Sequence, residues 1–279
     1  MNIQTATSST TATMPDYNAI KTKQQTTWGA GDYGRVGVTL QITGELLCES
    51  MDLYAGQTVL DVASGNGNVS LAAARRFCKV VSTDYVPSLL DQSRRRAAAD
   101  GLAIDYREAD AEDLPFADAA FDNVVSTFGV MFTPNQPQAA SELLRACKPG
   151  GKIGLANWTP DGFIGQLFKV IGRYLPPPAG INSPATWGTQ SFLDTHFGSR
   201  VSDIHARPRQ FMFRYNSPEH WLDVFSKFYG PMLKAFEALD DQAGASLRDD
   251  IMQLIATHNR AARGPMVVPS DYLEVVIIR

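Results

Sequence analysis

Apolar residues in the middle of the chain fall into short runs that alternate with amphipathic stretches. Short runs bounded by turn-forming residues are typical of buried strands, and the stretches between them are typical of helices. The predicted strands are residues 58–62, 80–84, 104–107, 121–127 and 152–158, and the predicted helices are residues 69–77, 88–100 and 137–147. This alternation predicts right-handed βαβ units, a parallel sheet and helices on both of its faces.

The pattern changes on either side of this region. Residues 17–53 have helical periodicity, and the Ser- and Thr-rich residues 1–16 are expected to form a disordered tail. After residue 158 the alternation stops. The pattern there predicts a loop around 176–178, a short helix at 192–197, strands at 201–205 and 211–215, helices at 218–239 and 244–262, and a last strand at 273–278.

We therefore expect a single domain over residues 17–279 with an α/β fold. Its expected parts are N-terminal helices that form a lid (17–53), a ligand-binding core (56–158), two insertions that form a helical cap (159–200 and 217–264), and two C-terminal strands (201–215 and 272–279).

Composition and charge narrow the class of protein. With a formal net charge of −4, the chain has no basic surplus to neutralise a phosphate backbone, so nucleic acid is not expected as a partner. No apolar run approaches the roughly 18 residues of a membrane-spanning helix. Cys48, Cys78 and Cys147 are too few and too far apart for a disulfide framework or a zinc cluster, which favours a reducing, cytoplasmic location and no bound metal.

A glycine-bearing turn follows the first predicted strand. Asp61 lies near the end of that strand, and Ser64, Gly65, Asn66 and Gly67 lead into the next predicted helix. Glycine lets the backbone approach a ligand, and the first N–H groups of a helix carry a partial positive charge. Because open α/β sheets bind ligands at the carboxyl ends of their strands, this turn predicts a ligand site. A purely structural turn is the alternative.

Two acidic segments follow at corresponding places in the next strand–helix units. Asp84 ends the second strand 19 residues after Gly65, a spacing at which a carboxylate accepts both ribose hydroxyls of an adenosine. Residues 108–116 follow the third strand and include Asp110 and Ala111, a carboxylate beside a backbone N–H that can bind the edge of adenine. A helix cap and a solvated acidic loop are the structural alternatives.

These segments, with residues 121–126 and 143–152, resemble the class I S-adenosylmethionine (SAM)-dependent methyltransferases. The resemblance is closest to the small-molecule enzymes of ubiquinone and menaquinone biosynthesis, and it spans about residues 56–158. It implies a Rossmann-like seven-stranded sheet, mostly parallel, whose antiparallel last strand pairs with a strand near 201–205. It also implies SAM as the cofactor, S-adenosylhomocysteine (SAH) as the product, and no metal.

The resemblance further implies roles for individual residues. The methionine part of SAM is expected at Asp61, Ala63, Gly65 and Gly67, the ribose at Asp84, the adenine beside Tyr85, Asp110 and Ala111, and the sulfonium near Thr127. Ala63 departs from the family, which usually has glycine at that position.

The sequence contains no comparable motif for the binding site of the methyl acceptor. Residues 158–236 hold fifteen of the twenty-seven Phe, Trp and Tyr residues, which can line an apolar acceptor pocket or form the core of a cap. Candidate acceptor contacts are Trp158, Trp187 and His196. In residues 28–33, Trp28 and Tyr33 flank two glycines. This segment can close over the cofactor as a lid, with Tyr33 at the cofactor or the acceptor, or pack as a simple turn.

Other classes of protein agree less well with the sequence. A nicotinamide-dependent oxidoreductase would need a third glycine where Ser70 stands, and an RNA methyltransferase would need a basic surface. An enzyme that uses SAM without methylating, or a SAM-binding protein without turnover, would keep the same cofactor residues and stays open. We expect a SAM-dependent methyltransferase that acts on a small apolar or aromatic metabolite at an O, N or C atom, with no residue marked as catalytic.

Overall fold

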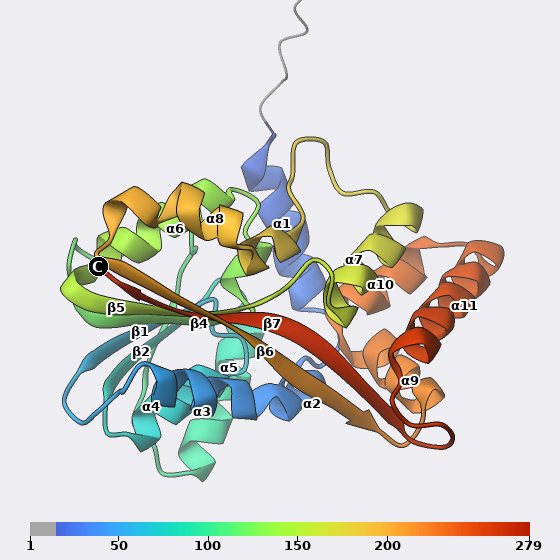
Figure 1. Ribbon diagram of the computed structural model, residues 1–279, viewed down its shortest axis with the longest axis horizontal. Helices are drawn as coiled ribbons and strands as arrows, with labels where there is room; N and C mark the ends of the chain where they lie inside the picture. Colours follow the sequence, from blue (N-terminus) through green and yellow to red (C-terminus); the bar gives the residue numbers. More distant parts are fainter. Residues whose placement is uncertain (1–14) are drawn as a thin grey trace, which may run out of the picture.

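Seven strands form one sheet in the computed structural model, which describes residues 15–279 (Figure 1). The strand order is β3-β2-β1-β4-β5-β7-β6. Strands β1 to β5 are parallel, whereas β7 runs antiparallel to both β5 and β6. The strands are β1 Thr58–Val62, β2 Lys79–Asp84, β3 Asp105–Glu108, β4 Phe121–Thr127, β5 Cys147–Trp158, β6 Asp203–Tyr215 and β7 Met266–Ile278. The predicted α/β fold with an antiparallel last strand is confirmed.

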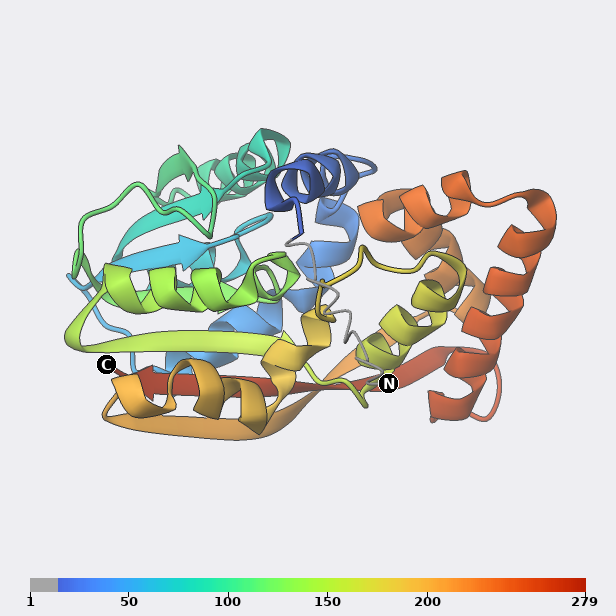
Figure 2. The ribbon, with the colours of Figure 1, turned by 90° about the horizontal axis from the view of Figure 1, so that it is seen from above.

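Helices cover both faces of the sheet and gather beyond one end of it. Helices α3, α4 and α5 lie against one face, and α6 and α8 lie against the other (Figure 1). Helices α7, α9, α10 and α11 form a group beyond the sheet, with α1 beside α10 (Figure 2). The α-helices are α1 Tyr17–Trp28, α2 Gly34–Gly37, α3 Gln41–Ser50, α4 Asn68–Arg75, α5 Pro87–Ala99, α6 Gln136–Ala146, α7 Phe163–Tyr174, α8 Gln190–His196, α9 Pro218–Phe228, α10 Gly230–Ala238 and α11 Asp241–His258; the 3₁₀ turns are η1 Val38–Leu40, η2 Val130–Phe132, η3 Pro184–Gly188 and η4 Gly198–Arg200.

The central strand β1 is buried on both sides because helices cover both faces of the sheet. Leu60 and Val62 belong to the larger apolar cluster, whereas Val59 packs with residues of α3 and α4. Asp61 lies among these apolar residues with no exposed surface. A carboxyl group buried in this way requires hydrogen-bond partners.

The order of the strands locates the ligand end of the sheet. From β1 the chain adds β2 and β3 on one side, and it then crosses to add β4 and β5 on the other. The reversal opens a crevice at the carboxyl ends of β1 and β4, where open α/β sheets bind ligands. The carboxyl ends of the parallel strands point toward α1 and the helices beyond the sheet (Figure 2).

The C-terminal hairpin is longer than the sequence predicts. Residues 201–205 and 211–215, expected as separate strands, lie in or beside one continuous strand, β6, and β7 begins at Met266. The predicted antiparallel pairing of the two is confirmed. Pro208 interrupts the apolar pattern of β6 but not the strand, because an edge strand has no partner on one side for the missing N–H.

Residues 218–239, predicted as one helix, form two helices that meet at Tyr229. Tyr229 has an extended backbone, with φ −88° and ψ 103°. Pro231 lies in the first turn of α10, where its missing N–H is tolerated, but it would break an uninterrupted helix. The break points the Tyr229 side chain toward the ligand end of the sheet, where it lines a cavity.

Two further regions differ from the expected outline. Helix α7 was not predicted, because Gly165 and Gly172 lower the helical propensity of its sequence. Residues 1–14 of the predicted tail lie outside the described residues, and Asp16 caps α1 by accepting the Ala19 N–H at 3.0 Å.

Among residues 15–279, no helix is long and apolar enough to cross a membrane.

Candidate functional site

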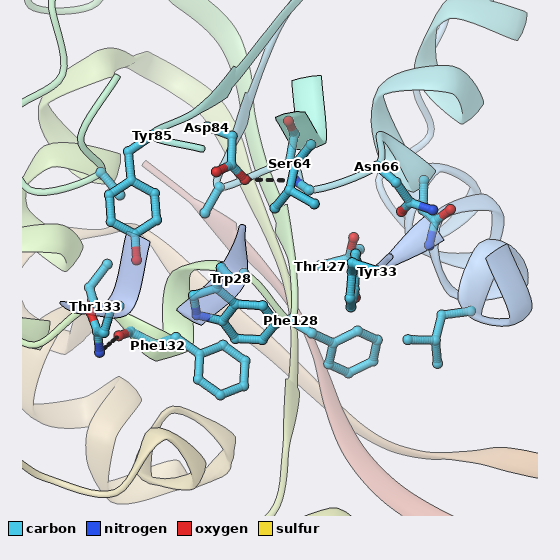
Figure 3. Close-up of a pocket in the computed structure, with 18 of the residues that line it drawn as sticks. Trp28, Tyr33, Ser64, Asn66, Asp84, Tyr85, Thr127, Phe128, Phe132 and Thr133 are labelled. Atoms are coloured by element: carbon cyan, nitrogen blue, oxygen red, sulfur yellow. Dashed lines mark hydrogen bonds between the residues drawn. The ribbon is translucent and has the colours of Figure 1, made fainter. Parts of the chain in front are cut away.

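The turn after β1 forms part of the wall of a cavity at the carboxyl edge of the sheet (Figure 3). Gly65 and Gly67 have φ angles of 55° and 83°, in the left-handed region that favours glycine. At Gly67 a Cβ atom would lie 1.9 Å from the Oγ atom of Ser93, so no side chain can be placed there. The Gly67 N–H closes the turn by donating to the Ser64 carbonyl oxygen at 2.9 Å. The backbone path therefore favours glycine at both positions, and at Gly67 the contact with Ser93 also leaves no space for a side chain.

Ala63, where the family usually has glycine, also has a left-handed backbone, with φ of 52°. Its carbonyl oxygen lies against Gly129, where a Cβ atom would be only 1.9 Å away. The alanine thus keeps a glycine-like conformation at a cost of about 1–2 kcal/mol, and Gly129 leaves room for it.

Asp84, at the end of β2, connects the turn to the neighbouring strand. Its side chain is buried, and its Oδ2 atom accepts the Gly65 N–H at 2.8 Å (Figure 3), while its Oδ1 atom accepts the Val86 N–H at 2.9 Å. Burial raises the pKa of Asp84 to about 6, and the backbone hydrogen bonds limit the rise. The carboxylate is therefore held in one orientation beside the cavity.

Asp61 lies beneath the turn and does not line the cavity. The Ser70 hydroxyl donates to its Oδ2 atom at 2.5 Å, and a chain of hydroxyls continues from Ser70 through Ser82, at 2.9 Å, to Ser64, at 2.8 Å. Its Oδ1 atom has no partner among the described residues. Burial raises the pKa of Asp61 to about 8, and the Ser70 hydrogen bonds oppose the rise. Asp61 thus supports the turn from below.

The loop after β3 brings two carboxylates to the same cavity. Asp110 accepts the Glu112 N–H at 2.9 Å on its Oδ1 atom. Lys21 of α1 reaches both carboxylates, with Nζ–O distances of 2.5 Å to Asp110 and 3.1 Å to Glu112. Burial acts to lower the pKa of Lys21, but its hydrogen bonds to the two carboxylates outweigh this effect, so the pKa is raised.

Aromatic side chains line the opposite half of the cavity. Trp28 packs edge-on against Phe132 and Tyr229, with ring centroids 4.8 and 5.5 Å apart. Phe128 stacks on Trp158 at 4.0 Å, with the two rings 11° from parallel. Further apolar lining comes from Val36, Leu40, Ile164, Phe213 and Phe225.

The two halves form one cavity of about 1110 Å³, including its open mouth. Figure 3 shows the polar side chains of Asp84, Ser64 and Asn66 along one side and the rings of Phe128 and Phe132 along the other. The polar and the aromatic lining therefore face one continuous space.

Most of the predicted site residues meet at this cavity. Those that line it are Trp28, Tyr33, Ala63, Gly65, Asp84, Tyr85, Asp110, Ala111, Thr127 and Trp158. Asp61 lies beneath the turn and Gly67 lies within it, and neither residue lines the cavity.

Trp187 and His196 do not reach the cavity. Trp187 is fully buried against Phe192 and Phe197, and the His196 ring packs on Phe192 with centroids 4.3 Å apart. Of their elements, η3 packs against β5 and η2, and α8 packs against α6 and η3. Within residues 159–200, the cavity lining comes from Ile164 of α7.

Several residues that line the cavity are not predicted from the sequence. Phe128 and Phe132 follow β4 at the edge where the other strands end, a position that could have indicated them. Tyr229 precedes Gly230 and Pro231, a pair that signals a break in the helix. Lys21 carries no local signal, because its partner Asp110 is 89 residues away.

Neither a histidine nor a metal cluster marks this cavity. The chain's four histidines are absent from its lining, and within residues 15–279 no group of three or more His, Cys, Asp or Glu side chains is placed to hold a metal ion. Burial raises the pKa of Tyr33 to about 12 and also raises that of Tyr229, so both phenols are neutral hydrogen-bond donors. The titratable side chains in the lining are Lys21, Tyr33, Asp84, Tyr85, Asp110, Glu112 and Tyr229.

Comparisons with known proteins agree with this geometry. A family model described as a methyltransferase domain matches residues 60–155. The uncharacterized protein Rv1403c of Mycobacterium tuberculosis is 40% identical over 232 residues, which are 81% of this chain and 85% of that protein. Demethylmenaquinone methyltransferase of Thermus thermophilus is 37% identical over 144 residues, 50% of this chain and 65% of that enzyme.

A solved structure gives the same fold. The YcgJ protein of Bacillus subtilis matches 84% of this chain and 96% of its own length, with a TM-score of 0.59 and 16% identity. The methyltransferase domain lies on the strands and loops that build the cavity. The chain belongs to the class I SAM-dependent methyltransferases, in one family with the mycobacterial protein.

Proposed function

We propose that this methyltransferase binds SAM across the carboxyl ends of β1, β2 and β3 and transfers its methyl group to a small, uncharged acceptor in the aromatic half of the cavity. The observation that carries the proposal is the division of a single cavity into two halves. One half is lined by buried carboxylates and a glycine turn, and the other by aromatic rings.

The residues of the polar half fit the chemistry of SAM. Each carboxylate oxygen of Asp84 accepts one backbone N–H and keeps a lone pair for a ribose hydroxyl. The Nδ2 atom of Asn66 is buried beside the cavity without a partner among the described residues, so it can donate to the methionine carboxylate. Asp110 and the backbone of Ala111 face the position expected for adenine.

Tyr33 connects the two halves. Its Cε1 atom lies 3.3 Å from the position of a Cβ atom at Gly65, and its ring packs against Trp28 with centroids 5.8 Å apart. A molecule in the aromatic half would therefore meet the methionine end of SAM near this ring. We expect Tyr33 and Thr127, which both line the cavity, to lie beside the reacting groups.

The main task of the chain in this reaction is positioning. When bound, SAM supplies a methyl group on a positively charged sulfur, and the leaving thioether is neutral. The stacked rings of Phe128 and Trp158 can orient a planar acceptor and exclude water from it. Such orientation lowers a reaction barrier by about 7–11 kcal/mol in well-aligned systems.

The aromatic half favours an uncharged acceptor. The side chains contributed by α7, α9 and β6, namely Ile164, Phe225 and Phe213, carry no charge. An ionic acceptor would lose its hydration there without gaining a counter-ion. The name of the Thermus relative supports a reduced naphthoquinone as the first acceptor to test.

A product assay tests the proposal. Purified full-length protein is incubated with methyl-labelled SAM and a panel of naphthohydroquinones and phenols, each paired with its sulfonated counterpart. We expect SAH and methylated product in equal amounts, and only with the neutral ring of each pair. A preference for the sulfonated compounds would contradict the acceptor class. Binding of SAM with no methylated product from any acceptor would favour non-methylating chemistry.

A further inference from the structure

Helix α1 contributes Lys21, Gln24 and Trp28 to the lining of the cavity, but none of its residues is fully buried in the core. Polar side chains attach it to three loops. Lys21 binds the loop after β3, the Gln25 amide donates to the Tyr85 carbonyl after β2, and the Gln24 amide donates to the Phe132 carbonyl after β4 at 2.9 Å. The position of α1 therefore depends on the loops after β2, β3 and β4, and all three of these loops line the cavity.

Lys21 makes the strongest of these attachments. Its Nζ atom lies 2.5 Å from Oδ2 of Asp110 and 3.1 Å from Oε2 of Glu112. The Glu112 side chain is only 5% exposed, and its Oε1 atom accepts the Asn135 N–H at 2.7 Å. Lys21 is the only cationic side chain among the described residues that line the cavity. A shared and partly buried ion pair of this kind is costly to break from one side.

We propose that Lys21 is a positioning residue that latches α1 over the adenine end of the SAM site and holds Asp110 in place. The inference rests on the proposed function, because it takes Asp110 as the group that binds adenine. Without Lys21, the Asp110 and Glu112 carboxylates would face each other as like charges. The loop and α1 would then loosen together, and a ligand enclosed by the latched helix would dissociate faster.

A purely electrostatic role for Lys21 predicts a different result. Removing its charge makes the polar half more negative, and SAM carries one more positive charge than SAH. The field alone would therefore increase the affinity for SAM relative to SAH. A latch encloses the adenosine that both compounds share, so its removal weakens both to the same degree.

The test compares Lys21→Met with Lys23→Met. Lys23 is on the exposed side of α1 and makes no ion pair within residues 15–279, so it controls for loss of one positive charge. We expect Lys21→Met to raise the Kd of both SAM and SAH by about tenfold in calorimetric titrations, with their ratio unchanged, whereas Lys23→Met leaves both Kd values near wild type. Lys21→Arg should restore most of the affinity.

Hydrogen exchange of the ligand-free protein gives a second measurement. Backbone amides of α1 should exchange faster in Lys21→Met than in wild type or Lys23→Met. If wild-type protein binds neither SAM nor SAH, the proposed function fails. If wild type binds both ligands, the proposed function stands and the latch can be tested separately. Any of three results in Lys21→Met would refute the latch: an unchanged Kd, unchanged exchange of the α1 amides, or a gain in affinity for SAM relative to SAH.

Discussion

Asp84 serves the fold and the candidate ligand site with one carboxylate. It accepts the N–H groups of Gly65 and Val86, and it thereby fixes the end of β2 against the turn after β1. Its remaining lone pairs face the cavity. Because its pKa is raised only to about 6, it is mostly ionised at neutral pH and can accept two hydroxyl hydrogen bonds.

We predict that Asp84→Ala raises the Kd of SAH by at least about tenfold, because the ribose loses a charged acceptor for two hydroxyls. Ligand hydroxyls favour the ionised carboxylate, so the affinity of wild type should also fall as the pH drops below about 6. Calorimetric titration measures both effects, with the exposed Asp91→Ala on α5 as control. A change of less than about threefold in Asp84→Ala would refute the assignment.

Ala63 gives a prediction about stability. Its left-handed φ of 52° is strained for alanine and relaxed for glycine. Ala63→Gly should raise the free energy of unfolding by about 1 kcal/mol, measured by urea denaturation. Ala98→Gly, at an exposed position in the last turn of α5, should lower it instead. If both substitutions destabilise the protein, the backbone at Ala63 is not strained.

At the scale of elements, the local pattern of apolar and polar residues predicts the strands and helices of the core, but it does not predict which residues of the cap line the cavity. Strands β1, β4 and β5 are buried between helices, so they appear in the sequence as apolar runs, and the glycine turn and Asp84 follow at fixed distances. Trp158 and Trp187 look alike in sequence, because each lies among apolar and small residues. Tertiary packing separates them: Trp158 lines the cavity, whereas Trp187 is buried against Phe192 and Phe197. Such packing is a long-range property that a local pattern does not contain.

This difference between the two tryptophans can be measured. Trp158→Leu should weaken binding of the acceptor found in the product assay by about tenfold, because Phe128 loses its stacking partner, and it should leave SAH affinity near wild type. Trp187→Leu should lower the free energy of unfolding by about 3 kcal/mol and leave acceptor affinity unchanged. The measurements are acceptor titration and urea denaturation. Equal effects of both substitutions on acceptor affinity would place the acceptor elsewhere.

For the whole molecule, the free energy of unfolding depends on pH through several carboxyl groups, and these groups act in different directions. Asp61 and Asp84 are buried at the centre of the sheet, and burial raises the pKa of Asp61 to about 8. Asp122 lies near the opposite end of the sheet, where the hydrogen bond from Lys148 and those from Thr58 lower its pKa to about 2. Relative to the unfolded chain, folding therefore favours the protonated form of Asp61 and Asp84 and the ionised form of Asp122.

The sign of each effect follows from proton counts. Between about pH 4 and 8 the folded protein holds a proton on Asp61 that the unfolded chain has lost, so the contribution of Asp61 to stability falls as pH rises. The stabilising contribution of Asp122 is fully present above about pH 4 and is lost only as pH falls toward 2. The two groups thus act in separate pH ranges.

We therefore predict that the free energy of unfolding of wild type falls from pH 5 to pH 8, and that Asp61→Asn flattens this slope. The limit for one proton is about 1.4 kcal/mol per pH unit. Asparagine matches the neutral carboxyl in shape and keeps an acceptor for the Ser70 hydroxyl. Asp122→Asn should lower stability by a constant amount over the same range and leave the slope unchanged. Urea denaturation at each pH measures all three proteins, and parallel curves for wild type and Asp61→Asn would show that Asp61 is ionised in the folded protein.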